Sequence, residues 1–138
     1  MQKIIIDTNV FVSALIQRNY PYYIVDSLFS NQNIKLCISN EVLKEYQEVL
    51  NREKFSRFTD FFAQAQILLS EIERVSEKYY PQVKLDIIQD IDDNKFLELA
   101  ETCKADFLIT GNSNDFSMQA YKTTRIITPK DYWEIYSS

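Results

Sequence analysis

The sequence predicts a single α/β domain, residues 1–138, with a central parallel β-sheet of about four to five strands flanked by helices. Its 138 residues fit one domain, because single domains usually contain roughly 100–200 residues. Hydrophobic residues make up 46% of the chain and charged residues 25%, which is enough for a core without disulfides or a structural metal. Short β-branched runs alternate with segments of helical periodicity, and this order is typical of a parallel sheet with right-handed crossovers.

Four apolar runs rich in β-branched residues are predicted to be strands. Each run is nearly continuous rather than alternating, which favours strands that are buried on both faces of a parallel sheet. The runs are Lys3–Ile6, Ile34–Ile38, Asp106–Ile109 and Arg125–Ile127.

The segments between these runs have apolar residues at helical spacing and are predicted to be helices. Ser39 or Asn40 is a suitable N-cap for the third helix. The longest helix is expected to bury Phe58, Phe62 and Val75 among other apolar side chains. The predicted helices are Asn9–Ile16, Tyr22–Phe29, Val42–Leu50, about Ser56 to Lys78, Phe96–Cys103 and Lys130–Tyr136.

The composition excludes several kinds of active site. The chain has no histidine, so it has no imidazole base, no Ser-His or Cys-His nucleophile pair and no histidine metal ligand. Gly111 is the only glycine, which excludes the glycine-rich loops that bind dinucleotides and nucleotide phosphates. Cys37 and Cys103 are too few for a four-cysteine zinc site and lie in apolar runs, so we expect two reduced core thiols.

The charge balance is acidic, with 15 basic and 20 acidic side chains and a net charge of -5. The negative electrostatic field of such a protein repels nucleic acid and anionic membranes. An anionic substrate therefore needs a local basic patch or a hard cation bound among carboxylates. The first residues do not resemble a signal peptide, and no run approaches the roughly 20 apolar residues of a membrane span. The sequence therefore predicts a cytoplasmic protein that does not bind membranes.

Polar side chains follow three of the predicted strands. Asp7 follows the first strand, Ser39 the second, and Thr110 and Asn112 the third. Because ligands of open parallel sheets bind beyond the carboxyl ends of the strands, we expect these residues to line one edge. The alternative for Asp7 is a helix N-cap, a position that favours aspartate.

The third helix places one glutamate closer to the interior than the others. At 100° per residue, Glu45 lies about 40° from Val49, which belongs to the apolar face, whereas Glu41 and Glu48 lie farther away. Glu45 is thus the functional candidate on this helix. The alternative is an ordinary surface glutamate.

Three acids, Asp90, Asp92 and Asp93, precede the fifth predicted helix. Helix capping explains one of them, because acids are favoured at helix N-termini. Like charges this close together favour a bound cation, and Asp93, one turn before Phe96, is expected to point toward the packed side. Asp115 is a further candidate near the edge of the third strand.

These residues resemble a known family, the PIN-domain ribonucleases, and most of all its VapC-like members, the toxins of toxin-antitoxin systems. The resemblance extends over nearly the whole chain. The segments that carry it are Asp7–Val10, Glu45 within Ser39–Tyr46, Asp92–Ala100 and Ala105–Asn112.

The resemblance implies that Asp7, Glu45 and Asp93 are acidic ligands of Mg²⁺ or Mn²⁺. The family's fourth acid corresponds to Asn112 here, so one ligand is weakened or is replaced by Asp115. Asp90 is an additional candidate ligand, and the candidate substrate contacts of the edge are Thr8, Asn9 and Thr110. The implied activity is that of a metal-dependent endoribonuclease, which acts on RNA and is restrained by a protein antitoxin. A homodimer is the further partner state expected.

The chemistry agrees with this resemblance, because two-metal hydrolysis of a phosphodiester requires oxygen ligands and no histidine. Arg52, Lys54 and Arg57, interleaved with Phe55 and Phe58, form a candidate RNA-binding patch. The alternative for this patch is solvated surface charge. Some of the many tyrosines, together with Trp133, could serve a dimer or antitoxin surface.

Two other functions are compatible with the sequence. One is a binding protein of the same fold whose site, with Asn112 and an acidic net charge, has lost its activity. The other is a different carboxylate-metal phosphotransfer fold, such as a haloacid-dehalogenase-like phosphatase or a receiver domain. The second is disfavoured because Asp7 is followed by Thr8 and Asn9 rather than by a further acid.

Overall fold

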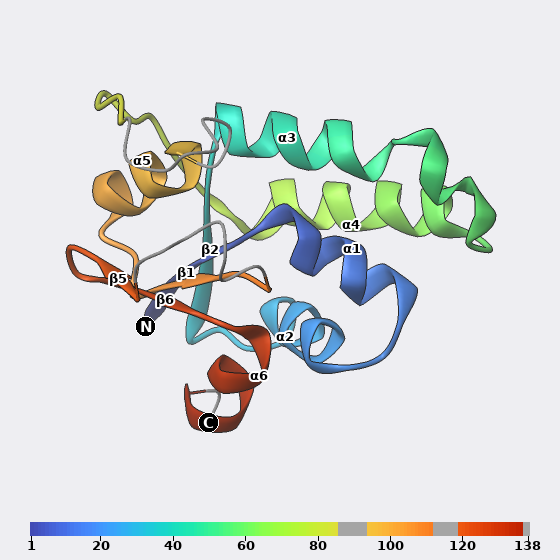
Figure 1. Ribbon diagram of the computed structural model, residues 1–138, viewed down its shortest axis with the longest axis horizontal. Coiled ribbons are helices and arrows are strands. Elements are labelled where there is room, and N and C mark those ends of the chain that lie inside the picture. The colour runs from blue at the N-terminus through green and yellow to red at the C-terminus, as the bar shows by residue number, and fades with distance from the viewer. Residues whose placement is uncertain (86–93, 112–118, 137–138) are drawn as a thin grey trace.

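The computed structural model describes residues 1–85, 94–111 and 119–136 and contains a mostly parallel sheet with the strand order β3-β2-β1-β4-β6-β5 (Figure 1). Strand β1 pairs in parallel with β2 on one side and β4 on the other, and only β5 runs antiparallel to its neighbour β6. The parallel α/β architecture predicted from the sequence is confirmed. The strands are β1 (Gln2–Ile6), β2 (Ile34–Ser39), β3 (Glu77–Tyr79), β4 (Phe107–Ile109), β5 (Ala120–Tyr121) and β6 (Thr124–Ile127).

Helices follow most of the parallel strands, and α3 and α4 lie side by side in Figure 1. Ser39 is the N-cap of α3, because its Oγ accepts a hydrogen bond of 3.1 Å from the backbone N–H of Val42. The helices are α1 (Thr8–Ile16), α2 (Tyr20–Leu28), α3 (Asn40–Leu50), the 3₁₀-helix η1 (Glu53–Arg57), α4 (Phe61–Val75), α5 (Asn94–Cys103), α6 (Pro129–Asp131) and the π-helical turn η3 (Tyr132–Tyr136).

The prediction of one long helix from about Ser56 to Lys78 is wrong at both ends. Asp60 adopts a left-handed conformation with φ of 61°, which separates the 3₁₀-helix η1 from α4. At the other end the chain becomes extended at Ser76 and enters strand β3. Phe58, Phe62 and Val75, which flank these ends, are half-buried rather than buried.

Two strands lie at the edges of the sheet and were not expected from the sequence. Glu77 and Lys78 of β3 are exposed, so this strand has no apolar run. Strand β5 has only two residues and turns into β6 through Lys122, which has a φ of 52°. Both strands are defined by backbone pairing with a neighbour rather than by burial, which explains why the apolar pattern does not reveal them.

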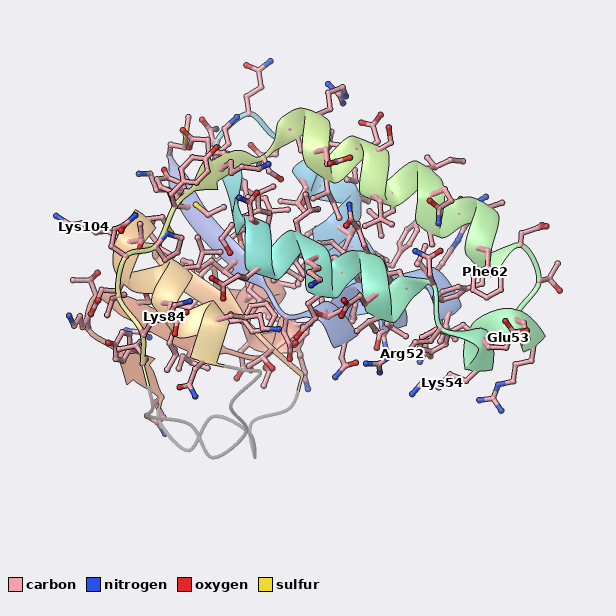
Figure 2. All side chains as sticks on the ribbon, turned by 90° about the horizontal axis from the view of Figure 1, so that it is seen from above. Arg52, Glu53, Lys54, Phe62, Lys84 and Lys104 are labelled. Carbon is pink, nitrogen blue, oxygen red and sulfur yellow. The ribbon has the colours of Figure 1, made fainter. Side chains whose placement is uncertain are left out.

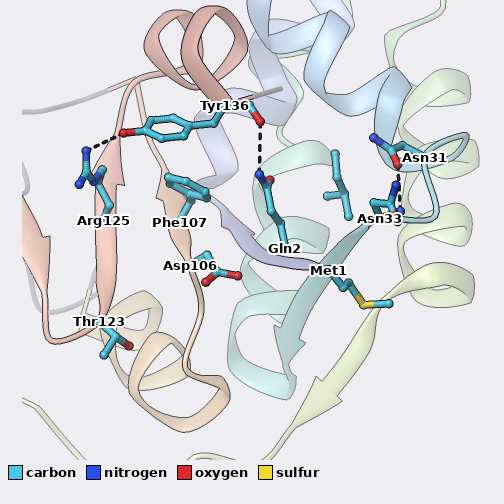
Figure 3. A pocket seen from close by; sticks show the side chains of 10 residues that line it. Met1, Gln2, Asn31, Asn33, Asp106, Phe107, Thr123, Arg125 and Tyr136 are labelled. Carbon is cyan, nitrogen blue, oxygen red and sulfur yellow. Dashed lines mark hydrogen bonds between the residues drawn. The ribbon is translucent and has the colours of Figure 1, made fainter. Parts of the chain in front are cut away.

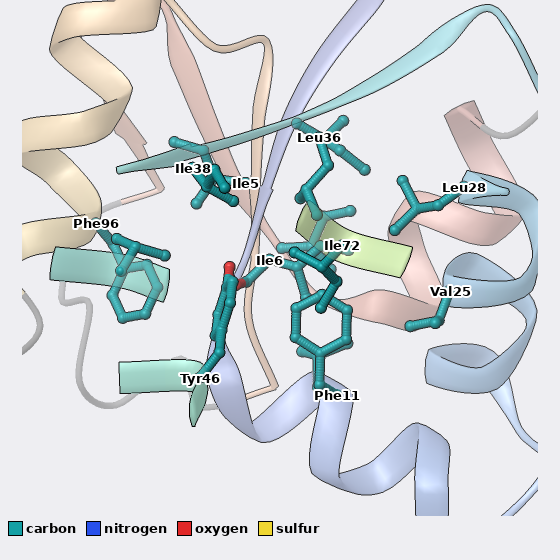
Figure 4. Packing of buried hydrophobic residues seen from close by; sticks show 14 of the residues in the cluster. Ile5, Ile6, Phe11, Val25, Leu28, Leu36, Ile38, Tyr46, Ile72 and Phe96 are labelled. Carbon is teal, nitrogen blue, oxygen red and sulfur yellow. The ribbon is translucent and has the colours of Figure 1, made fainter. Parts of the chain in front are cut away.

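The core lies between the central strands and the helices, and Figure 4 shows its packing around β1. Ile5 and Ile6 of β1 are completely buried, as expected for a central strand covered on both faces. The ring of Phe11 on α1 meets the ring of Tyr46 on α3 edge to face at a centroid distance of 4.9 Å. Cys37 and Cys103 are buried free thiols, which confirms the prediction.

The amino-terminal ends of the strands border a cavity of about 520 Å³ that is lined by residues such as Asn33, Asp106 and Arg125 (Figure 3). Here the side chain of Gln2 is held between two residues of η3. Its Nε2 donates to the carbonyl of Tyr136 at 3.2 Å, and its Oε1 accepts from the hydroxyl of Tyr132 at 2.6 Å. These bonds connect η3 to the first strand. Within the described residues, no helix is long and apolar enough to span a membrane.

Candidate metal centre

Asp7 and Thr110 meet at the point where the strand order of the sheet reverses. Asp7 follows β1 and Thr110 follows β4, the two neighbouring strands whose connections run to opposite sides. Thr110 Oγ1 donates a hydrogen bond of 2.7 Å to Oδ2 of Asp7, and both residues are buried. Open α/β sheets bind their ligands at such a switch point, so the fold places a buried carboxylate at its most favourable ligand position.

Asp7 occupies the N-cap position of α1, where its side chain makes no capping hydrogen bond of normal geometry. Burial raises the pKa of Asp7 above its usual value, the hydrogen bond from Thr110 opposes this rise, and the nearby carboxylate of Glu45 adds to it. The backbone N–H groups of Thr8 and Asn9 also oppose the rise in its pKa. A carboxylate whose charged form is disfavoured in this way gains from a neighbouring cation.

Glu45 extends from α3 toward the start of α1. Its Oε2 accepts a hydrogen bond from Thr8 Oγ1, and its Oε1 accepts one of 3.0 Å from Lys95 Nζ. The side chain of Glu45 is 16% exposed, whereas that of Glu41 is 51% exposed and Glu48 lies on the surface. Glu45 is therefore the least exposed glutamate of α3, and it lies on the Asp7 side of the helix.

The two threonines predicted to contact substrate make hydrogen bonds to the carboxylates of the site. Thr8 and Thr110 are buried, with exposed fractions of 2% and 1%. Their hydroxyls donate to Glu45 and to Asp7, so they orient the two carboxylates rather than face the solvent. Asn9 is exposed and stays a candidate substrate contact.

A cleft of about 420 Å³ separates α3 from α5 and contains Glu45 in its wall. Charged residues of both signs line it, among them Lys44, Lys95 and Glu98. Lys95 was not singled out as a site residue by the sequence. No local pattern indicates its role, because its partner Glu45 lies 50 positions away in the sequence.

Glu98 is a second residue of the cleft that the sequence did not indicate. It is only 6% exposed, and its Oε2 accepts a hydrogen bond of 2.9 Å from the backbone N–H of Leu85. Lys84 lies 4.0 Å from the other oxygen of Glu98 and 3.1 Å from Glu41. Glu98 thereby fastens the chain at Leu85 to the second turn of α5.

The basic patch predicted at the end of α3 is present on the surface. Arg52 and Lys54 are exposed and lie at the end of α3 that is far from Lys84 (Figure 2). The ammonium of Lys54 lies 5.3 Å from the ring centroid of Phe55, and the guanidinium of Arg57 lies over the Phe58 ring. Phe55 is buried, so this ring supports the patch but cannot stack on a base.

Several predicted ligands lie outside the described residues. These are the acids of residues 86–93 and the two candidates of residues 112–118, namely Asp90, Asp92, Asp93, Asn112 and Asp115. Among the residues that the structure describes, no three acidic, histidine or cysteine side chains are grouped as a metal site. The described part of the site consists of two carboxylates, those of Asp7 and Glu45.

The donor set fits a hard divalent cation. Carboxylate oxygens are the ligands preferred by Mg²⁺ and Mn²⁺, and Asp7 and Glu45 interact electrostatically with each other at the edge of the sheet. Burial of one carboxylate beside another is unfavourable without a positive charge. In the described residues, Lys95 is the cation that contacts Glu45.

Comparison with known proteins identifies the family. Residues 3–114 match the PIN domain family, and the chain therefore belongs to it. The uncharacterized protein MJ1680 of Methanocaldococcus jannaschii is 30% identical over 141 aligned positions, which cover 96% of this chain and 90% of that protein.

A solved structure at low sequence identity shares this fold. It is the crystal structure of VapBC2 from Rickettsia felis bound to a DNA fragment from their promoter. A chain of that structure superposes with a TM-score of 0.59 at 19% identity, and the match covers 92% of this chain and 98% of that one.

Proposed function

We propose that this PIN domain protein is an endoribonuclease that depends on Mg²⁺ or Mn²⁺ and acts as the toxin of a toxin-antitoxin pair. The observation that carries the proposal is the placement of Asp7 and Glu45. These two carboxylates, each oriented by a threonine hydroxyl, come together at the switch point of a parallel sheet. Metal-dependent hydrolysis needs oxygen ligands at such a place. It does not need histidine, and the chain has none.

The proposed metal ligands are Asp7 and Glu45 together with Asp93 and Asn112. Asp90 and Asp115 are the further candidates in the segments outside the described residues. A divalent ion held by these residues would supply the activation of water and the stabilisation of negative charge that phosphodiester hydrolysis requires. Residues of the chain orient the proposed ligands: Thr110 fixes the carboxylate of Asp7, and Thr8 fixes that of Glu45.

The proposed substrate is RNA, and its proposed contacts are three exposed side chains. Asn9 follows the first strand, and Arg52 and Lys54 lie beyond the end of α3. Because the net charge of -5 repels a polyanion, a local basic patch is needed to attract the phosphates.

The proposed partner is a protein antitoxin, and a homodimer is proposed as the state of the nuclease itself. The fold is shared with a chain of the VapBC2 structure, which is bound to a DNA fragment from their promoter. On this protein, Tyr23 is 40% exposed and its ring lies 5.6 Å from that of Trp133, while Ile135 is 64% exposed. Exposed tyrosine and tryptophan side chains are typical of protein interfaces.

The test is cleavage of a fluorescently labelled structured RNA by the purified protein, with Mn²⁺, with Mg²⁺ and with EDTA. We expect cleavage with either metal, none with EDTA, and recovery when Mn²⁺ is restored. Asp7→Asn and Asp93→Asn, purified in the same way, should lose cleavage while they keep the wild-type circular dichroism spectrum. Full activity of both variants would contradict the proposal. Failure of the folded wild type to cut any RNA with Mn²⁺ would favour a binding protein of the same fold.

A further inference from the structure

The carboxylate of Glu45 has a hydrogen-bond partner on each of its oxygens. Thr8 donates to Oε2, and the ammonium of Lys95 donates to Oε1 at 3.0 Å. Neither charged side chain is freely solvated, because Lys95 is 20% exposed and Glu45 is 16% exposed. This ion pair therefore joins the two walls of the cleft, α3 and α5, in a partly water-excluded place.

The position of Lys95 is electrostatically unfavourable without its partner. Lys95 is only 20% exposed, and a lysine that loses water needs a carboxylate in return. Glu45 supplies that carboxylate, so the energetics of Lys95 are tied to one oxygen of a proposed metal ligand.

We propose that Lys95 and the divalent cation compete for Oε1 of Glu45, so that Lys95 sets the metal concentration at which the site fills. This inference rests on the proposed function, because it assumes that Glu45 is a metal ligand. It goes further in assigning to one lysine of the chain the control of metal affinity.

Competition follows from the charges and the donor geometry. A metal ion bound through Oε1 would lie next to the ammonium that already occupies this oxygen, and two positive charges at such a distance repel each other strongly. Lys95 must therefore give up its bond to Glu45 when the metal binds, and the free energy of the ion pair is subtracted from the free energy of metal binding. Oε2 accepts one hydrogen bond, from the buried Thr8, and keeps a lone pair for a metal ion. A metal ion bound there would still share the carboxylate with the ammonium on Oε1, so the same repulsion would act on it.

Lys44 provides a matched control in the same cleft. Its ammonium carries the same charge and lines the same cavity, but the residue is exposed and forms no ion pair with another described residue. Removal of either lysine changes the net charge by one unit and adds the same general attraction for a cation. Only removal of Lys95 also frees Oε1 of Glu45.

The experiment is calorimetric titration of Mn²⁺ alone into the wild type, Lys95→Met and Lys44→Met. We expect Lys95→Met to bind Mn²⁺ roughly three- to tenfold more tightly than the wild type, as loss of a partly buried ion-pair competitor implies, and Lys44→Met to change the affinity less than about twofold. Equal effects of both variants, or equal or weaker binding by Lys95→Met, would overturn the competition.

Two further readings separate this inference from the proposed function. If the wild type binds Mn²⁺ and Lys95→Met gains nothing, the inference fails while the metal centre stands. If neither binds Mn²⁺, both proposals fail.

Should Lys95→Met not fold, Lys95→Gln carries the same expectation. Melting curves give an independent readout: in EDTA, Lys95→Gln should melt below the wild type, and Mn²⁺ should raise its Tm by more. A smaller rise with Mn²⁺ would overturn the inference.

Discussion

The hydroxyl of Tyr46 donates a hydrogen bond of 2.5 Å to the carbonyl of Ile6. This bond fixes α3 to the last residue of β1, and both partners are completely buried (Figure 4). The next residue after Ile6 is Asp7, and the residue before Tyr46 is Glu45. The spacing between the two carboxylates of the candidate metal centre is therefore set by a buried contact directly behind them.

Tyr46→Phe should lower the free energy of unfolding by about 1 kcal/mol, because it removes one buried hydrogen bond and keeps the aromatic ring that packs on Phe11. Urea denaturation measures the effect. RNA cleavage should fall as well, since α3 is no longer fixed to β1. Tyr80→Phe is the control, because Tyr80 is 64% exposed and its change should leave both quantities near the wild type. An unchanged urea midpoint for Tyr46→Phe would contradict the assigned role.

Asp7→Asn should raise the Tm at pH 7 in EDTA by about 3 °C, an effect of the size expected from roughly 1 kcal/mol. Burial raises the pKa of Asp7 in the folded protein, and the carboxylate of Glu45 adds to this rise. The folded state therefore holds the proton more tightly than the unfolded state, and stability is lost as the pH rises through the folded pKa. The gain from the substitution should vanish below the usual aspartate pKa of 3.8.

Scanning calorimetry of the wild type and Asp7→Asn in EDTA, from about pH 3 to about pH 8, measures this difference in Tm. A lower Tm of Asp7→Asn at pH 7 would show that the buried carboxylate stabilises the metal-free protein.

Much of the fold follows from local sequence patterns. The runs that contain Ile4 and Leu108 are continuous and apolar because these strands are covered on both faces, and that pattern is visible without a structure. Helical periodicity likewise locates Glu45 near the buried face of α3, because its angle to Val49 depends on the helix geometry alone.

The parts that could not be predicted depend on contacts between distant segments. The pair of Lys95 and Glu45 joins residues that are 50 positions apart, and no periodicity encodes it. The left-handed backbone of Asp60 interrupts a helical pattern that looks continuous in the sequence. An aspartate adopts this conformation only occasionally, so its presence does not predict that the helix ends there. Strand β3 exists only because β2 offers it a backbone partner.

Asn112→Asp should tighten a second metal site and raise activity at low metal concentration, because an amide oxygen ligates without contributing charge. The wild type should bind one ion with moderate affinity and a second only at high metal or with RNA, and Mn²⁺ should support more activity than Mg²⁺. If Asp115 already supplies the missing oxygen, Asp115→Asn is the damaging change and Asn112→Asp is nearly silent. Calorimetry with cleavage rates distinguishes these cases. Tight binding of two ions by Asp115→Asn would contradict the loose second site.

Lys54→Gln and Arg52→Gln should each weaken RNA binding, and each lost phosphate contact should lower the slope of log K against log salt by about 0.7 for a single strand. Fluorescence anisotropy over a salt series measures this slope. The matched control is Lys104→Gln, because Lys104 is exposed and lies at the opposite end of the molecule (Figure 2). Equal slopes for Lys54→Gln and Lys104→Gln would mean that the patch is solvated surface charge.

The comparison of three glutamates on α3 tests the metal centre most directly. Single-turnover cleavage of a structured RNA with Mn²⁺ is measured for Glu45→Gln, Glu41→Gln and Glu48→Gln. Glu45→Gln should lower the rate by about 100-fold, which corresponds to about 2.7 kcal/mol of transition-state stabilisation. Glu41→Gln and Glu48→Gln should lower it by less than about threefold, because these side chains are exposed. Wild-type cleavage by Glu45→Gln, with loss of cleavage in Glu41→Gln, would contradict the account.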